Sequence, residues 1–297
     1  MESNLIQFDW AIKNVLRNKA NFNVLSGFLT ELLKKKIEVI ELIESEGNKE
    51  TADDKTNKLD LIAKIDNGEI AIFEVQTSKE HDFFHRILYG ASRAVTQQLT
   101  EGKKYGDIKK VYSIDIVYFE LGKGTDYIYR GITDFRGIHN NETLMLSESE
   151  MKFLPQESTT QSASSLFPEY YLIYPKRFNN DAIKTKFDEW VYVLKNSAVK
   201  KEFSAAGVKE AGKALDKAKM TPAQRQMYED YLKSERVKED EIESARFEGK
   251  TEGLAEGKAE GRMEEKIETA KNLKKMGLSA EQIAQATGLS VHEIENL

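Results

Sequence analysis

The strongest constraint on the fold of this chain comes from two apolar segments that are joined by Asp66-Asn67-Gly68. Residues 58–65 (KLDLIAKI) and residues 70–76 (IAIFEVQ) are rich in branched apolar side chains, which is typical of β-strands. The joining segment contains Asn-Gly, the dipeptide that most strongly favours a tight hairpin turn. The two segments are therefore predicted to form an antiparallel hairpin.

The register of this hairpin decides which side chains share a face. A two-residue turn at Asn67-Gly68 would place an apolar residue of the first strand opposite Glu74 and mix charged with apolar side chains. A three-residue loop with a left-handed glycine and a bulge instead pairs Ile65 with Glu69, and hence Asp60 with Glu74. We expect this second register because it separates the two kinds of side chain.

In that register one face of the hairpin is apolar and is expected to form the core. It carries Leu59, Leu61, Ala63, Ile65, Ala71, Phe73 and Val75. The other face carries Lys58, Asp60, Ile62, Lys64, Ile70, Ile72, Glu74 and Gln76. The acidic groups are therefore predicted to gather on one face, at the end of the hairpin away from its turn.

The segments around the hairpin indicate the fold class. Helical spacing of apolar residues predicts helices at residues 8–16, 22–33 and 83–99, and branched apolar runs predict further strands at 37–43, 111–119 and 127–133. The resulting order is two helices, three strands, one helix and two strands. This is an α/β pattern that contains an antiparallel hairpin.

Composition narrows the chemistry that the chain can perform. It has 44 basic and 50 acidic residues among 297, a net charge of -6, which excludes the basic footprint of a protein that coats nucleic acid non-specifically. It has no cysteine, which excludes disulfides, thiolate catalysis and thiolate metal sites, and its four histidines offer little for zinc. Any metal is therefore expected to be held by carboxylates.

The sequence gives no indication of membrane association. The first residues, MESNLIQFDWAIKNVL, lack a basic segment followed by an apolar one, and no apolar run approaches the roughly 18 residues of a membrane span. We expect a cytoplasmic protein.

Asp60 and Glu74, facing each other across the hairpin, would repel unless a cation or a proton lies between them. A hard divalent ion suits this position, Mg²⁺ or alternatively Mn²⁺, with the backbone carbonyl of Val75, waters and a substrate phosphate as further ligands. Such an ion activates water and polarises phosphorus. Gln76 shares the face of Glu74 and is placed to orient the attacking water. A second explanation stays open, because acidic side chains on solvent-facing strands are common.

A set of motifs in this order resembles a known family. They are Asp9 in FDWAIKNVL, Asp60, Glu74-Val-Gln76, the segment DFFHRILYGASR from Asp82 to Arg93, and Gly102-Lys-Lys-Tyr105 before a strand. Over roughly residues 5–135 the chain resembles the PD-(D/E)XK nuclease family transposases, also called recombination-promoting nucleases or Rpn. The Glu-Gly-rich tail is also similar to such proteins.

The resemblance implies a restriction-endonuclease-like core, a mixed central sheet flanked by helices, that cuts DNA by metal-dependent phosphodiester hydrolysis. It implies that Asp60 and Glu74 bind the metal and that Gln76 stands where the wider superfamily usually has a lysine. A further acid from the helical region often joins such sites. Asp9 fits the family pattern better than Glu31, which is alternatively a helix-surface residue.

A glutamine at position 76 carries no charge, so stabilisation of the transition state has to come from the metal or from another group. Lys58, predicted opposite Gln76, and Lys64 on the same face are candidates for this role and for contact with DNA. Alternatively, both are ordinary solvated lysines.

Three side chains of the predicted helix at 83–99 are further candidates for DNA contact. Arg86, Tyr89 and Arg93 lie three or four residues apart and share a face of the helix. Beside the metal site they would contact phosphates. Alternatively, Tyr89 packs in the core while the arginines pair with surface acids.

The domain organisation follows from shifts in composition. We expect a nuclease-like core at residues 1–155, a Ser/Thr-rich loop or linker at 156–168 (QESTTQSASSLFP), and a helical extension that packs on the core at 169–245. Residues 246–297 are expected to form a Glu/Gly-rich helix or spacer followed by a short tail.

Four glycines recur every four residues in EGKTEGLAEGKAEGR, each preceded by glutamate, at positions 249, 253, 257 and 261. Each interior glycine costs a helix about 1 kcal/mol relative to alanine. The segment is therefore either a weak helix or flexible spacer, or a close-packed seam for self-association. The second reading makes a homo-oligomer through the C-terminal helical region a candidate assembly.

The last twenty residues have the form of two short helices around a Gly-Leu-Ser turn, with Ser279 and Ser290 as N-caps. This arrangement resembles a helix-turn-helix. The second helix, VHEIENL, contains no Arg or Lys, so its potential to read DNA is poor. We expect a packing or interaction element.

The sequence therefore predicts a cytoplasmic, Mg²⁺-dependent DNA endonuclease with DNA as its partner. The alternative is a nuclease-fold protein that no longer cuts and serves as a DNA-binding or assembly module.

Overall fold

The computed structural model describes residues 5–43, 61–99, 102–152 and 162–297, and of Ala218 it describes only the backbone. The chain divides into two compact units, Met1–Arg225 and Gln226–Leu297. The first unit contains the sheet and its covering helices. The second contains most of one long helix and two short ones.

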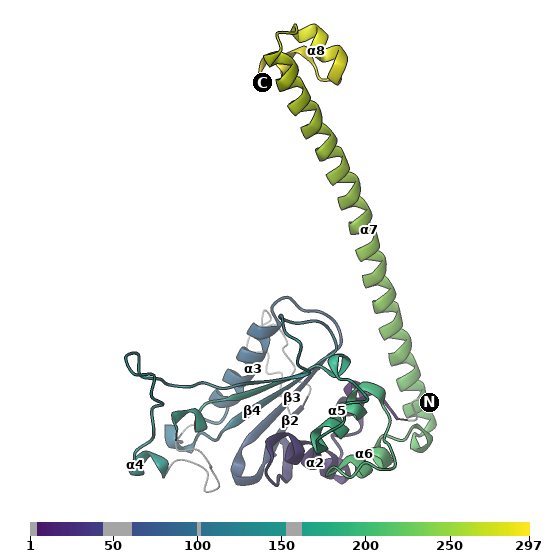
Figure 1. The fold of residues 1–297 in the computed structure, drawn as a ribbon. Helices are drawn as coiled ribbons and strands as arrows, with labels where there is room; N and C mark the ends of the chain where they lie inside the picture. Colours follow the sequence, from purple (N-terminus) through teal and green to yellow (C-terminus); the bar gives the residue numbers. More distant parts are fainter. Residues whose placement is uncertain (1–4, 44–60, 100–101, 153–161) are drawn as a thin grey trace. The chain divides into compact units, whose positions relative to one another are not determined.

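The elements follow the order that the sequence predicts, with additions after β5 (Figure 1). The helices are α1 (Phe8–Asn14), α2 (Phe22–Leu33), α3 (Phe83–Thr96), α4 (Glu148–Met151), α5 (Lys186–Asn196), α6 (Val208–Ala214), α7 (Pro222–Lys275), α8 (Ala280–Thr287) and α9 (Val291–Glu295). The strands are β1 (Val39–Ile43), β2 (Leu61–Ile65), β3 (Ile70–Gln76), β4 (Val111–Val117), β5 (Ile128–Gly131) and β6 (Glu169–Ile173). Short 3₁₀ turns occupy Lys19–Asn21, Asp66–Gly68, Tyr105–Asp107, Ala163–Ser165, Pro175–Arg177 and Lys217–Lys219.

The strands form one mixed sheet in the order β1-β2-β3-β4-β6-β5. The β3–β4 and β4–β6 pairs are parallel, whereas the β1–β2, β2–β3 and β5–β6 pairs are antiparallel. The α3 crossover connects the parallel strands β3 and β4, as a parallel connection requires. The predicted fold class, a mixed central sheet flanked by helices with a helical C-terminal extension, is confirmed.

One segment differs from its predicted state. The range 169–245 was expected to be a helical extension, but it begins with strand β6, which lies inside the sheet between β4 and β5. The segment EYYLI contains residues favoured in strands but spans only five positions, so its pattern alone does not separate it from a short helical segment. Its pairing with both β4 and β5 decides its state.

The predicted register of the hairpin is confirmed over its described part. Leu61 lies opposite Phe73, and the Ile65 amide donates to the Glu69 carbonyl at 2.8 Å. The three-residue loop has Asn67 at φ 58° and Gly68 at φ 78°, both left-handed. A glycine is favoured at such a position because a Cβ is strained there. Asp60 lies outside the described residues.

One face of the sheet is covered by α1, α2 and α5 around a buried aromatic cluster. The ring of Phe28 in α2 lies 5.9 Å from Phe73 of β3, 6.2 Å from Phe8 of α1 and 5.4 Å from Trp190 of α5. Phe28, Phe73 and Trp190 are fully buried. Rings of this size dominate the apolar area that a core removes from water.

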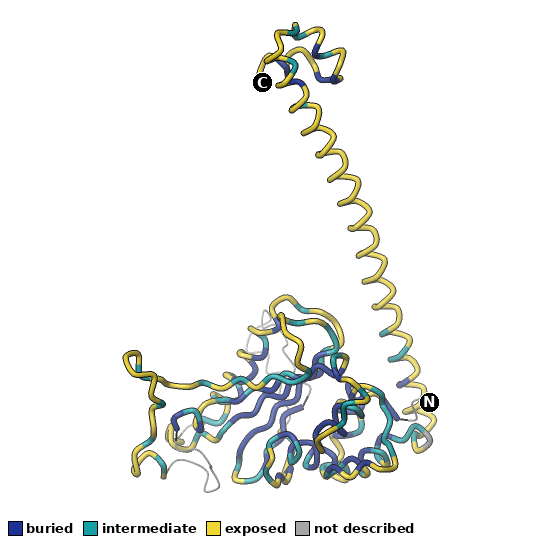
Figure 2. The backbone as a smooth tube through the Cα atoms, viewed as in Figure 1, coloured by how far each residue is buried: buried dark blue, intermediate teal, exposed yellow. Residues whose placement is uncertain are grey.

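The other face of the sheet is buried as well, which the sequence did not indicate. Helix α3 covers it, and Ala91 and Ala94 of that helix pack against Ile62, Ile70 and Ile72. Figures 1 and 2 show α3 on the opposite side of the sheet from α2 and α5, with buried strands between them. The face that carries Glu74 is therefore an interior face and not a solvent-exposed one.

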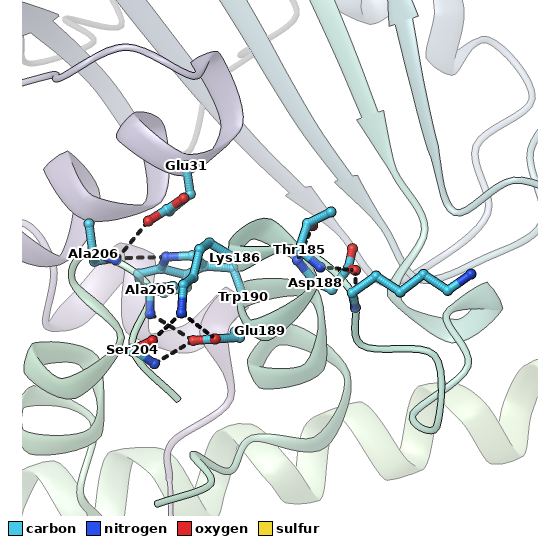
Figure 3. A network of polar contacts seen from close by, with 10 residues as sticks. Glu31, Thr185, Lys186, Asp188, Glu189, Trp190, Ser204, Ala205 and Ala206 are labelled. Atoms are coloured by element: carbon cyan, nitrogen blue, oxygen red, sulfur yellow. Dashed lines mark hydrogen bonds and ion pairs between the residues drawn. The ribbon is translucent and has the colours of Figure 1, made fainter. Parts of the chain in front are cut away.

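A polar network joins α2 and α5 to the segment that precedes α6 (Figure 3). Glu31 accepts a hydrogen bond from the Ala206 amide at 2.9 Å, and the Trp190 ring nitrogen donates to the Ala206 carbonyl at 2.9 Å. Glu189 accepts from the amides of Ser204 and Ala205 at 2.6 and 2.7 Å. These bonds satisfy backbone groups that would otherwise be buried without partners.

In the second unit, α7 is a continuous helix whose glycines at 249, 253, 257 and 261 are exposed (Figure 2). A Cβ added at any of the four would meet nothing within 4 Å. The tail folds as predicted: Ser279 caps α8 and Ser290 caps α9, around a small core of Ala270, Ile283, Leu289 and Ile294. Within the described residues, no helix has both the length and the apolar character needed to span a bilayer.

Candidate active site

Glu74 lies in the middle of β3, on the face of the sheet that α3 covers. It is 2 % exposed, and the two preceding positions on the same face, Ile70 and Ile72, are buried and apolar. Its partner in the parallel pairing with β4 is Asp115. Adjacent strands lie about 4.8 Å apart, so two carboxylates meet on a buried surface.

Asp115 is 1 % exposed, and Ser113 of the same strand donates a hydrogen bond to its Oδ2 at 3.0 Å. Burial raises the pKa of Asp115 to about 8, and the Glu74 carboxylate acts in the same direction. The Ser113 hydrogen bond and the Arg86 charge lower the pKa but do not outweigh burial. Near neutral pH, Asp115 therefore holds a proton.

Arg86, in the first turns of α3, supplies the positive charge at this site. Its Nη2 contacts Glu74 Oε1, and its Nη1 donates to both carboxylate oxygens of Glu80, at 2.9 and 3.2 Å. Burial disfavours the charged form, but the charges of Glu74 and Glu80 outweigh it and raise the pKa of Arg86. The guanidinium is therefore charged at every ordinary pH.

Gln76 lies at the end of β3 and belongs to the same network. Its Nε2 donates to Glu80 Oε1 at 2.9 Å and to the carbonyl and hydroxyl oxygens of Ser78 at 3.2 and 3.3 Å. Glu80 therefore holds both Gln76 and Arg86. The loop after β3 fixes the amide of Gln76 two positions beyond Glu74.

Several predicted site residues lie elsewhere or outside the described part of the chain. Asp60 and Lys58 precede β2 and are not described. Lys64 pairs with Glu41 of β1 at 3.0 Å and lies opposite Ile70, at the turn end of the hairpin. Along the strand this is about 13 Å from Glu74, so the structure does not bring Lys64 to that carboxylate.

Asp9 and Glu31, the two candidates for a third acid, lie in α1 and α2, across the sheet from α3. Asp9 is buried at the start of α1. Burial, together with the charge of Asp9, raises the pKa of Tyr118, whose amide donates to the Gln76 carbonyl at 2.9 Å. Asp9 therefore lies near the side chain of Tyr118, whose hydroxyl donates to the Leu194 carbonyl of α5 at 2.9 Å. Glu31 is engaged with the Ala206 amide, a structural contact.

The candidate DNA-contacting residues of α3 differ in exposure. Tyr89 is 53 % exposed, so the alternative in which it packs in the core is wrong. Arg93 is half-buried, and Arg86 pairs with buried Glu74 in addition to Glu80. Phe84 and Leu88 are also exposed on this helix, at 48 and 56 %.

Two residues of the site were not anticipated from the sequence. Asp115 is a single acid within the apolar strand VYSIDIV, and that placement is the signal that would have marked it, since an unpaired acid in a buried strand is costly. Glu80 lies in a polar loop and has no comparable signal. Its role follows only from the fold of residues 77–82 around Gln76 and Arg86.

Among the described residues, no group of three or more acidic or histidine side chains is arranged to hold a metal ion. Glu74, Asp115 and the backbone carbonyl of Val75 are the oxygen donors that the described strands place together. Asp60 is not among these donors, because it lies outside the described residues.

A mixed sheet in which the hairpin strand that carries Glu74-Val-Gln76 is followed by a helix that crosses to a parallel strand is a restriction-endonuclease-like fold of the PD-(D/E)XK class. Comparison with family models makes this more specific, because the model described as PD-(D/E)XK nuclease family transposase matches residues 6–245. The chain belongs to that family. No curated protein and no solved structure matches it.

Proposed function

We propose that this protein is a divalent-metal-dependent DNA endonuclease of the recombination-promoting type, which hydrolyses phosphodiester bonds in the cytoplasm. The observation that carries the proposal is the pairing of Glu74 with Asp115 on the face of the sheet beneath α3. Two carboxylates so close require positive charge between them or a proton on one of them. The chain supplies one guanidinium and one proton, and a divalent cation would serve the same need.

The donor atoms suit a hard cation. Carboxylate oxygens and a backbone carbonyl, here from Glu74, Asp115 and Val75, are the ligands that Mg²⁺ and Mn²⁺ prefer. Asp60, which the sequence predicts to lie opposite Glu74, is proposed as a further ligand, and Asp9 as an additional candidate. When bound, the ion would activate a water and neutralise charge on the phosphate.

We assign to Gln76 the orientation of the attacking water. Its Nε2 is committed to Ser78 and Glu80, which leaves the amide oxygen to accept a hydrogen bond from that water. A neutral amide positions a water without removing its proton, so Gln76 contributes orientation and not base strength.

The DNA backbone is proposed to run along α3. Tyr89 is exposed there, and Arg93 lies one turn further on the same helix. Lys64, at the turn end of the hairpin, would contact phosphates away from the cleaved one. Lys58 is also proposed to contact DNA, and only the register predicted from the sequence supports this.

One observation favours the alternative, a nuclease-fold protein that binds DNA or assembles without cutting. Glu74 is 2 % exposed and already paired with Arg86, which is the arrangement of a carboxylate held for structural reasons. In that case, DNA would be retained without metal and would not be cleaved.

A plasmid assay separates the two functions. Supercoiled plasmid is incubated with full-length protein with and without Mg²⁺, and nicked and linear products are measured for wild type and Asp60→Ala. The endonuclease produces metal-dependent products that are lost in the variant. Retention of intact plasmid with and without Mg²⁺, or undiminished cleavage by Asp60→Ala, contradicts the proposed assignment.

We also propose that the protein self-associates through α7. In EGKTEGLAEGKAEGR, glutamate precedes each glycine, and Lys250, Leu254, Lys258 and Arg262 follow them. At about 100° per residue, the exposed glycine stripe therefore has an acidic flank on one side and a mainly basic flank on the other.

This arrangement favours a parallel pair of α7 helices. When two copies face each other across the glycines and are related by a twofold axis along the helices, each acidic flank meets a basic one. In an antiparallel pair, acidic flanks would meet acidic ones. The exposed apolar side chain of Leu254 (57 %) lies on the flank beside the glycines and would lose contact with water on pairing.

A further inference from the structure

Arg86 contacts Glu74, the carboxylate that the proposed function also requires as a metal ligand. Its Nη2 contacts Glu74 Oε1, the oxygen of a carboxylate that is 2 % exposed and has little access to water. The proposed function requires the same carboxylate as a metal ligand. A guanidinium and a divalent cation on one carboxylate repel each other, so binding of the ion weakens the contact between Arg86 and Glu74.

The second anchor of Arg86 does not depend on Glu74. Nη1 donates to Glu80 at 2.9 and 3.2 Å, and the Glu80 side chain is 31 % exposed, on the loop that follows β3. Among the described residues, the Nε of Arg86 is buried without a hydrogen-bond partner. The side chain therefore has a fixed pivot at Glu80 and donor groups that can turn toward another acceptor.

A DNA phosphate is the acceptor that fits these donors. A guanidinium presents paired N–H groups that match phosphate oxygens, whereas a lysine offers only a point charge. Gln76, the neighbour that shares Glu80, carries no charge. Arg86 contacts Glu74 directly and is therefore a cationic side chain placed at this carboxylate.

We propose that Arg86 exchanges partners during the reaction. It pairs with Glu74 while the site holds neither metal nor DNA, and it turns to the phosphate to be cleaved once the metal ion has bound Glu74. Glu80 keeps hold of the guanidinium in both positions. The inference rests on the proposed endonuclease function and assigns Arg86 both the protection of the empty site and the positioning of the substrate.

Two properties of full-length protein test the exchange. The affinity for Mn²⁺ in the absence of DNA is measured by electron paramagnetic resonance, and kcat and KM are measured separately on plasmid with Mg²⁺. The variants are Arg86→Gln and Arg86→Lys. Arg136→Gln is the matched control, because Arg136 is an exposed arginine paired with Asp134 outside this network.

Arg86→Gln removes the competitor for Glu74, so we expect Mn²⁺ to bind roughly 5- to 150-fold more tightly, the range typical of coupled sites. The same variant loses a charge on the phosphate, so kcat falls about 10²- to 10³-fold. Arg136→Gln changes neither quantity. Tighter metal binding together with slower cleavage is not expected of a side chain that only stabilises the fold.

Arg86→Lys keeps a positive charge beside Glu74 and protects the test if Arg86→Gln fails to fold. We expect wild-type affinity for Mn²⁺ but a kcat lowered about tenfold or more, because lysine cannot hold Glu80 and a phosphate together. The proposed exchange is overturned if Arg86→Lys has the kcat of wild type, or if Arg86→Gln binds Mn²⁺ no more tightly than wild type. Neither result contradicts the proposed endonuclease function. A wild-type protein that neither binds Mn²⁺ nor cleaves overturns both.

Discussion

At the scale of single residues, Asp115 shows how a buried strand accommodates a charge. The side chain has one hydrogen-bond donor, Ser113, and lies beside a second acid, Glu74. Burial raises its pKa to about 8, so the folded chain holds a proton that an unfolded aspartate, with a pKa near 3.9, releases. The folded state therefore binds more protons than the unfolded state between about pH 4 and pH 8.

This difference predicts how stability depends on pH. When the folded state binds more protons, the free energy of unfolding falls as the pH rises, by about 4 kcal/mol between pH 5 and pH 8 for this one group. Asp115→Asn keeps an acceptor for Ser113 and removes the titration. In chelator, we expect the stability of the variant relative to wild type to increase by several kcal/mol over that interval.

Urea unfolding at several pH values, with both proteins side by side, measures this difference, and other titrating groups cancel. A stability difference between the two proteins that stays constant from pH 5 to pH 8 would show that Asp115 is ionised in the folded chain.

Some residues of the site followed from the sequence and others did not. The position of Glu74 on the face with Ile72 and Gln76 followed from alternation and from the avoidance of mixed faces in the hairpin. The partners of Glu74 did not follow, because Asp115 and Arg86 come from a parallel strand and a crossover helix. Their distances from Glu74 are set by tertiary packing, which carries no local signal.

At the scale of elements, the packing of α2 depends on the absence of a side chain at Gly27. A Cβ there would lie 2.4 Å from the Ala206 carbonyl oxygen and from backbone atoms of Gly207. Those atoms are fixed by Glu31 and Trp190, so they cannot move aside without losing hydrogen bonds (Figure 3).

Gly27→Ala is therefore expected to cost about 3 kcal/mol or more, since overpacking against rigid backbone is at the upper end of such effects. Gly212→Ala in helix α6 is the matched control, because a Cβ at position 212 would lie at an ordinary contact distance of 3.5 Å from the Val199 side chain. There the better helix propensity of alanine predicts a gain of about 0.5–1 kcal/mol. Chemical denaturation measures both, and equal effects of the two substitutions would contradict the close approach.

The elements of the fold were mostly predictable, because amphipathic spacing in α2 and α3 and branched runs in β3 and β4 are strong local patterns. Two features were not. Strand β6 is only five residues long, too short for its pattern to be told from a helical segment, and it pairs with both β4 and β5. The cover of α3 over the Glu74 face could not be predicted from the hairpin, because Lys64 and Glu74 share that face with the buried isoleucines.

At the scale of the whole molecule, the acidic balance of the chain has two sources with different consequences. Part of it lies in the buried acids of the proposed site, and part lies on the exposed glutamates of α7. The latter are proposed to pair with basic residues of a second copy. Self-association and metal binding are therefore predicted to be separable by substitution.

Reversal of one flank tests this assembly. Changing Glu248, Glu252, Glu256 and Glu260 to lysine makes both flanks basic, so we expect the oligomer seen by sedimentation equilibrium to dissociate. Changing Lys250, Lys258 and Arg262 to glutamate in the same chain exchanges the flanks and should restore it, because the parallel pairing is again complementary. A monomeric wild type, or no effect of the single reversal, would contradict pairing through α7.

The most direct test of the central claim compares two buried glutamates of β3 and its preceding loop. Glu69 pairs with Lys35 at 2.8 Å and is as buried as Glu74, but it lies at the turn end of the hairpin. Glu74→Gln and Glu69→Gln are assayed with wild type for nicking of supercoiled plasmid in Mg²⁺ and in chelator. We predict metal-dependent nicking by wild type and Glu69→Gln, and a loss of at least about 10²-fold in Glu74→Gln. Equal nicking by Glu74→Gln and wild type would contradict the assignment of this site.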